Sequence, residues 1–206
     1  MKAKSGKEMR NLMLAVSLSV LVLVLAIISY FMIDTIVTTN NNIERNKELV
    51  IEQSVLSLTQ IGENISYMTE SPALIGIFNE DIIENIIGGD LQAFYDFIGE
   101  FAIPFYPIEY VGVVQSGEVV AYATKGGREI GSQDLPTEPP EGDYASLESL
   151  GDEEGLFISV FYPVELDFQG LEGFYVNMIV DRTDELAEVE AYFEGQRDDL
   201  ILRLSI

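Results

Sequence analysis

The chain has 206 residues, of which 35 are acidic and 11 are basic, so its formal net charge is −24. It contains no Cys, His or Trp, which excludes zinc fingers, iron–sulfur clusters, thiol nucleophiles and the Ser-His-Asp triad. A chain this acidic repels phosphate, so we expect no nucleic-acid partner. Its hydrophobic content of 48% is too high for wholesale disorder.

The first element along the chain is an uninterrupted apolar run at residues 11–33. As a helix rising about 1.5 Å per residue it spans roughly 34 Å, enough to cross the hydrocarbon core of a bilayer. Residues 1–10 carry four basic side chains and one acidic one. By the positive-inside rule we expect a cytoplasmic tail at 1–10, a transmembrane signal anchor at 11–33 and an extracellular domain at 34–206 of a single-pass cell-membrane protein.

A cleaved signal peptide is the alternative interpretation of the same run. Signal peptides have an apolar core of about 7–15 residues that ends in small side chains. Here the run is longer and ends in Ser29, Tyr30, Phe31 and Met32. These features favour an uncleaved anchor.

The charge is divided unevenly between the two parts of the chain. Residues 34–206 hold 7 of the 11 basic and 34 of the 35 acidic side chains, which gives this part a net charge of −27. Self-repulsion of this size keeps a domain soluble.

A long helix is predicted from residue 34 to about residue 71. Its apolar residues draw one stripe, spaced by three or four, and are Ile51, Val55, Leu58, Ile61, Ile65 and Met68. Such a stripe can pack on a sheet of the same domain or on a second copy of itself as a homodimer. Pro72 marks the expected end of the helix. Asn64, followed by Ile65 and Ser66, matches a glycosylation acceptor.

The remaining elements indicate an α+β domain. Short helices are predicted at 79–87 and 91–101, followed by a β-hairpin whose strands are 108–114 and 118–124. A Gly-, Pro- and acid-rich connection covers 125–155. A second hairpin then pairs 156–166 with 171–180, and a helix over 182–204 follows, with Leu186, Val189, Phe193, Leu200 and Leu204 near one face. Helices gathered before an antiparallel sheet are typical of the α+β class.

Two segments resemble the extracellular Cache sensors, which are the PAS-like domains of membrane receptors. They are YVGVVQSGEVVAYAT at 110–124, with the Gly-containing loop after it, and FISVFYPVELDFQGLEGFYVNMIVD at 157–181. The resemblance covers roughly residues 34–204 and includes the long helix after the membrane segment and the closing polar helix. It implies a PAS-like antiparallel sheet with flanking helices and a small-molecule ligand such as a carboxylate or an amino acid.

The resemblance also implies a role in signal transduction, in a receptor of chemoreceptor or histidine-kinase type. Such receptors usually return through a second membrane helix into a cytoplasmic output module, and this sequence has no second apolar run. Two alternatives therefore stay open. The sequence is either a truncated receptor or a sensor that acts through a separate signalling partner.

Strand alternation predicts which side chains face a ligand pocket. In the last strand, Phe174, Val176, Met178 and Val180 share one face, and Tyr175, Asn177, Ile179 and Asp181 share the other. The second set holds the polar groups and is the expected pocket side. Tyr122 is placed with Glu118 and Val120, and Tyr162 with Ile158 and Val160. The expected ligand-binding residues are Tyr110, Tyr122, Lys125, Arg128, Tyr162, Tyr175, Asn177 and Asp181.

Each of these residues also has a purely structural interpretation. Lys125 and Arg128 are scarce cations that could bind a ligand carboxylate or pair with the surrounding acids. The tyrosines could be packed rings with their hydroxyl groups at the surface. Asp181 could bind a ligand ammonium or cap the final helix.

We expect no catalytic residue, no cofactor and no metal site, and we do not expect an enzyme. The acidic clusters at 152–154 and 198–199 lack the spacing of a calcium loop and are interpreted as solvated. The alternative function is a pilin-like or other cell-surface structural subunit. A basic start, an apolar helix, an amphipathic helix and a β-rich head fit that plan, but charged residues separate Gly6 from the apolar run, which makes a poor pilin processing site.

Overall fold

The computed structural model describes residues 6–70, 92, 96, 103, 107–131, 134–166 and 171–205. The break predicted at Pro72 and the short helices predicted at 79–87 and 91–101 lie outside these residues, apart from isolated positions. The chain divides into two compact units, one formed by Met1–Lys47 with Glu188–Ile206 and the other by Glu48–Ala187.

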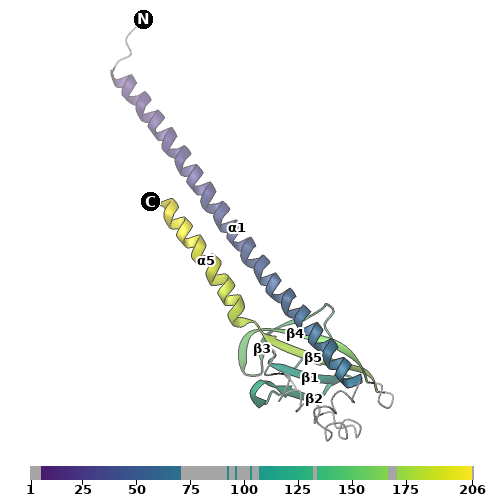
Figure 1. Ribbon diagram of the computed structural model, residues 1–206. Helices are drawn as coiled ribbons and strands as arrows, with labels where there is room; N and C mark the ends of the chain where they lie inside the picture. The colour runs from purple at the N-terminus through teal and green to yellow at the C-terminus, as the bar shows by residue number, and fades with distance from the viewer. Residues whose placement is uncertain are drawn as a thin grey trace. The chain divides into compact units, whose positions relative to one another are not determined.

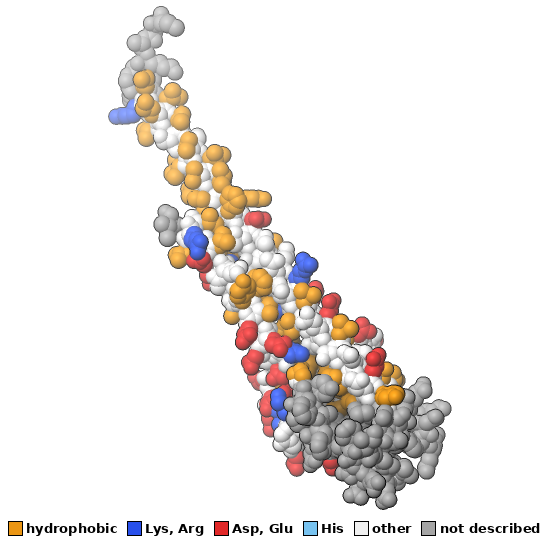
Figure 2. Space-filling model, in the orientation of Figure 1, with side chains coloured by type: hydrophobic (Ala, Val, Ile, Leu, Met, Phe, Trp, Pro, Cys, Tyr) orange, Lys and Arg blue, Asp and Glu red, His pale blue; other side chains and the backbone are white. Residues whose placement is uncertain are grey.

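The first element is one continuous helix, α1, which runs over Gly6–Glu70 (Figure 1). The predicted membrane segment and the predicted long helix are thus a single rod, because no Gly or Pro occurs between residues 6 and 62. α1 is long and apolar enough to span a membrane, and none of its most apolar 18-residue window is buried in the protein. Figure 2 shows hydrophobic side chains along this part of the helix.

Five antiparallel strands form a single sheet in the order β2-β1-β5-β4-β3. Their bounds are Tyr110–Gln115, Glu118–Thr124, Ala145–Leu150, Glu153–Leu166 and Leu171–Asp181 for β1 to β5. Both predicted hairpins are confirmed and belong to the same sheet. The first turns on Ser116 and Gly117, which both have positive φ, as a tight two-residue hairpin requires.

Part of the connection predicted over 125–155 was wrong. Residues 145–150 form β3, and β4 begins at Glu153, three residues before the predicted start. β3 is an edge strand in which only Leu150 is buried, so its sequence, ASLESL, can lack the β-branched and aromatic residues that marked the other strands.

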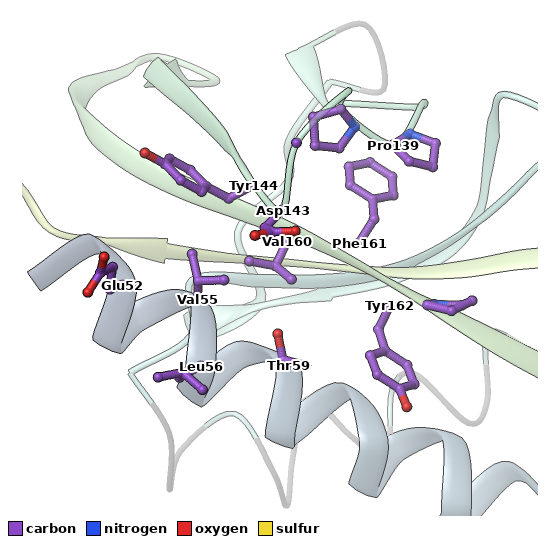
Figure 3. Close-up of a pocket in the computed structure, with 13 residues that line it drawn as sticks. Glu52, Val55, Leu56, Thr59, Pro139, Asp143, Tyr144, Val160, Phe161 and Tyr162 are labelled. Carbon is purple, nitrogen blue, oxygen red and sulfur yellow. The ribbon is translucent and has the colours of Figure 1, made fainter. Parts of the chain in front are cut away.

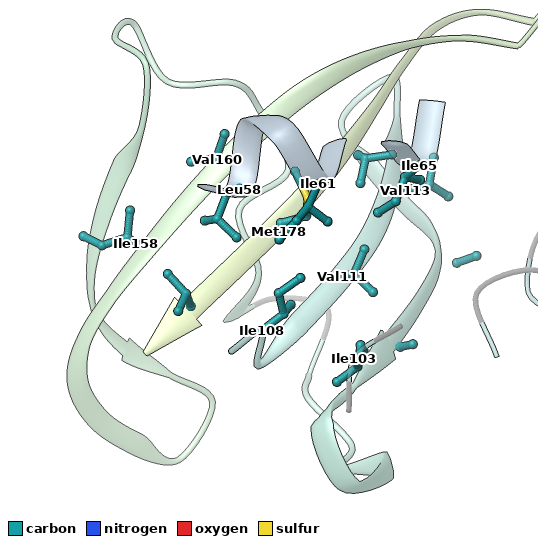
Figure 4. Close-up of a cluster of buried hydrophobic side chains, with 14 of the residues drawn as sticks. Leu58, Ile61, Ile65, Ile103, Ile108, Val111, Val113, Ile158, Val160 and Met178 are labelled. Carbon is teal, nitrogen blue, oxygen red and sulfur yellow. The ribbon is translucent and has the colours of Figure 1, made fainter. Parts of the chain in front are cut away.

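One face of the sheet packs on α1 and forms the larger hydrophobic core (Figure 4). Leu58, Ile61 and Ile65 of the predicted stripe are buried here, and Ile51 and Val55 are partly buried. The intramolecular interpretation of the stripe is therefore confirmed. The sheet contributes Val111, Val113, Ala121, Ala123, Ile158, Val160, Phe174, Val176, Met178 and Val180, so the predicted helix-facing set of the last strand is also confirmed.

Gly62 permits the closest approach between α1 and the sheet. A Cβ atom at this position would lie 2.6 Å from Cβ and 2.7 Å from Cγ of Tyr162 on β4. Contacts this short do not occur between folded side chains, and the first atoms of a side chain cannot swing away. A glycine is therefore required where the helix crosses β4.

The C-terminal helix α5 covers Thr183–Ser205 and confirms the predicted final helix. In the unit that contains most of it, Lys47 of α1 pairs with Glu190 of α5 at 2.8 Å. The half-buried residues Phe193, Ile201 and Leu204 form a stripe on one face of α5, called the inward stripe below. Leu200, which we expected near this stripe, is instead 48% exposed.

We predict opposite effects of the same substitution at two helical glycines. Gly62→Ala should lower the free energy of unfolding by about 1–3 kcal/mol, because the methyl group forces α1 away from Tyr162. Gly195→Ala on α5 meets no atom within 4 Å and should raise it by about 0.5–1 kcal/mol through helix propensity. Urea unfolding of both variants checks this. Equal effects of the two substitutions would contradict the close helix–sheet crossing.

Candidate functional site

The sheet face opposite α1, where we expected a pocket, carries a second hydrophobic cluster. Its buried members are Tyr110, Ile130, Leu135, Leu150, Phe157 and Ile179. Ile130 and Leu135 come from the segment that follows β2, so this segment covers the face. In the described part of the chain the centre of this face is filled by packed side chains.

Asn177 and Ser159 form a buried polar pair on this covered face. Ser159 Oγ donates to Asn177 Oδ1 at 2.7 Å, and Asn177 Nδ2 donates to the carbonyl oxygen of Pro136 at 3.2 Å. Both residues are fully buried, where an unpaired amide would be costly. The contacts give Asn177 a structural role, which is to tie the covering segment to β5.

Tyr110 is fully buried and its ring stacks on Tyr122 with 5.9 Å between ring centroids. Its side chain lies over Gly112, where a Cβ atom would collide with the Tyr110 hydroxyl. Among the described residues that hydroxyl has no hydrogen-bond partner. Burial, followed by the nearby Tyr122, raises the pKa of Tyr110 above its usual value.

One predicted face assignment was wrong in β2. The pairing shifts between Val113 and Val114, which leaves Val120 as an extra residue in β2. Val119 rather than Val120 therefore packs with Tyr122, and Val120 is 43% exposed. A bulge of this kind has no signature in the alternation of the sequence.

The two predicted cationic ligands both have carboxylate partners. Lys125 pairs with Glu109 at 2.6 Å, and Arg128 pairs with Glu153. The remaining cation of this unit, Arg182, pairs with Glu185 and also donates to Ser54 Oγ. These contacts favour the structural interpretation of the cations, although Nη2 of Arg128 is buried without a partner among the described residues.

Asp181 lies at the start of α5, where its carboxylate accepts hydrogen bonds from the backbone nitrogen of Thr183 at 2.8 Å and from its hydroxyl at 2.6 Å. These are the bonds of a helix-start turn and match the capping alternative. Asn64 is exposed on α1.

The predicted ligand-binding residues do not converge on one site. Tyr110, Tyr122, Asn177 and Tyr175 share the covered face, and Tyr175 makes an edge contact with Phe161 there. Tyr162 packs on the opposite face, against the core beside α1.

A groove of 620 Å³ lies at the edge of the sheet, beside β4 (Figure 3). Ala145, the first residue of β3, pairs with Ser159 of β4. The residues of β4 after Ser159 therefore extend past β3. The walls come from three elements: α1, the segment before β3, and β4. They are lined by Glu52, Val55, Leu56 and Thr59 of α1, by Pro139, Pro140, Gly142, Asp143 and Tyr144 before β3, and by residues 160–163 of β4.

The chemistry of the groove combines acidic groups with aromatic rings. Of the described residues that line it, Glu52 and Asp143 are the charged ones, and Tyr144, Phe161 and Tyr162 supply the rings. Carboxylates beside aromatic faces suit an organic cation. Among the described residues no group of acidic side chains is arranged to hold a metal ion.

Sequence reasoning missed the groove, apart from Tyr162. Two of its walls belong to elements far apart in the chain, and the third lies in the long connection predicted over 125–155. Pro139, Pro140 and Tyr144 were the only local signal in that segment.

No family model matches the chain, and comparisons with curated proteins and with solved structures also give no match.

We predict that the Tyr110 hydroxyl does not stabilise the protein in the absence of a ligand. Tyr110→Phe should leave the free energy of unfolding at pH 8 unchanged or raise it by about 1 kcal/mol, because it removes a buried hydroxyl that has no partner among the described residues. Gly112→Ala, which makes Tyr110 clash, should lower it.

The same variant gives a test of the raised pKa. The folded-state pKa of Tyr110 lies above the unfolded value of about 10. The unfolded chain therefore loses this proton first, and the free energy of unfolding falls as the pH rises past about 10. The stability advantage of Tyr110→Phe should therefore be larger at pH 10.5 than at pH 8 in urea unfolding. A constant difference would show that Tyr110 is solvated.

Proposed function

We propose that the chain is a membrane-anchored, extracytoplasmic sensor of small molecules that acts in signal transduction, and that its ligand site is the groove beside β4. One observation carries this proposal. The helix that supplies Glu52, Val55, Leu56 and Thr59 to the groove is the same helix that contains the apolar membrane segment. A ligand in the groove therefore touches the element that enters the bilayer.

The arrangement of the sheet supports the proposed likeness to Cache domains. β1 and β5 are neighbours at its centre, β2 and β3 are its edges, and the long helix covers one face. An antiparallel sheet with flanking helices is what the resemblance to Cache domains implies. The excess of basic residues before the apolar run supports an orientation with residues 34–206 outside the cell.

A ligand can act here by holding α1 and β4 in one of two relative positions. The groove walls belong to both elements, so a molecule that fits one position better shifts the population toward it. The crossing at Gly62 lies just beyond the groove and is packed without space for a methyl group. A small change in helix position must therefore repack the contact with Tyr162.

The charges favour a cationic ligand over a carboxylate. Among the described residues that line the groove, the two charged ones are acidic, and Lys125, Arg128 and Arg182 are already paired with carboxylates. The net charge of −27 on residues 34–206 concentrates cations near the domain. The ligand class we propose is an organic amine or quaternary ammonium compound.

Thermal unfolding of the full chain in lipid nanodiscs tests the proposal. Choline should raise the Tm in proportion to its occupancy, whereas its neutral isostere 3,3-dimethylbutanol and acetate at equal ionic strength should not. Asp143→Asn should weaken the effect at least tenfold in choline concentration. The matched control is Asp152→Asn, which removes an exposed acid that does not line the groove.

Two results would count against the proposal in different ways. Stabilisation by carboxylates, unchanged by Asp143→Asn, would place the ligand outside the groove. A broad panel of amines, carboxylates and sugars that leaves the Tm unchanged would overturn the sensor itself.

A further inference from the structure

The last turns of α5 present apolar side chains that do not face α1. Leu200 is 48% exposed and Leu202 is 60% exposed. The inward stripe of the helix runs through Phe193, Ile201 and Leu204, which are half-buried. Singly exposed leucines are common on protein surfaces, so what distinguishes Leu200 and Leu202 is their position along α1.

The ion pair between Lys47 and Glu190 fixes the level of these leucines along α1. α5 runs beside α1 in the opposite direction within the unit that contains both segments (Figure 1). Leu202 lies twelve residues after Glu190, and Thr35 lies twelve residues before Lys47. At about 1.5 Å per residue both offsets equal roughly 18 Å. Leu202 is therefore level with Thr35, directly outside the apolar run at 11–33.

We propose that the end of α5 docks on the surface of the bilayer that α1 spans, with Leu200 and Leu202 in contact with lipid. The partner is the lipid and not a second copy, because the exposed leucines are level with the exposed apolar side chains Ile36 and Val37, which adjoin the membrane segment. Lipid contact with α1 thus continues onto α5 without a gap.

The charges near the end of α5 are compatible with this position. Arg203 pairs with Asp199 at 2.7 Å and is 76% exposed, so its long side chain can place the guanidinium among headgroups. The surrounding acids would weaken binding to anionic lipids. The contact must therefore be apolar, and it should form on uncharged phosphatidylcholine. This inference rests on the membrane span that forms part of the proposed function, and it does not depend on a ligand in the groove.

Site-specific fluorescence on the full chain tests the contact, since the native sequence has no Cys that would need to be removed. Leu202→Cys carries the environment-sensitive dye NBD, and the chain is reconstituted in phosphatidylcholine nanodiscs with nitroxide-labelled lipids. Ala191→Cys is the matched control. It is exposed and lies eleven residues earlier, which is about three full turns, so it is on the same side of the helix but about 16 Å farther from the bilayer.

The expected result is at least a twofold loss of NBD fluorescence at position 202 with headgroup-level nitroxides, and little change at position 191. Leu21→Cys, in the middle of the apolar run, should be quenched by nitroxides placed deep in the bilayer.

Equal quenching by aqueous iodide at 202 and 191 would overturn the proposal. Protection of position 202 from iodide without quenching by the lipid nitroxides would also overturn it, because the leucines would then be covered by a second copy and not by lipid. Loss of deep quenching at position 21 would remove the span itself, and the docking with it.

Discussion

The contact on which the rest of the structure depends is the packing of α1 against the sheet. Leu58, Ile61 and Ile65 bury one face of β1, β5 and β4, with Met178 and Val111 beneath them. α1 is therefore not a tether attached to a finished domain, because it supplies one of the two layers that enclose the core. Without it the sheet would expose a continuous apolar face.

The two faces of the sheet serve different purposes as a result. The face beside α1 is the main core, and the other is closed by Ile130 and Leu135 and tied down through Asn177. Space for a ligand remains at the edge, where β4 outruns β3 and α1 forms the other wall. Of the described residues that line the groove, the charged ones are acidic and three supply aromatic rings, whereas Lys125 and Arg128 are paired with acids elsewhere.

The sequence predicted those features that follow from a regular period. The stripe on α1, the alternation in β5 and the two hairpins were all confirmed, because burial on one side imposes spacings of three to four or of two. It could not predict β3, whose edge position permits polar residues, or the bulge at Val120. The candidate site was largely missed because its walls meet only in the folded chain, and the predicted residue Asp181 is engaged at the start of α5.

Hydrogen exchange on the full chain in nanodiscs tests most directly whether α1 belongs to the core of the domain. If it does, the backbone amides of residues 54–66 should exchange as slowly as those of β1 and β5, and all should become exposed together as urea is added. Rapid exchange of residues 54–66 while β1 and β5 stay protected would contradict the account. It would show that α1 and the sheet fold independently.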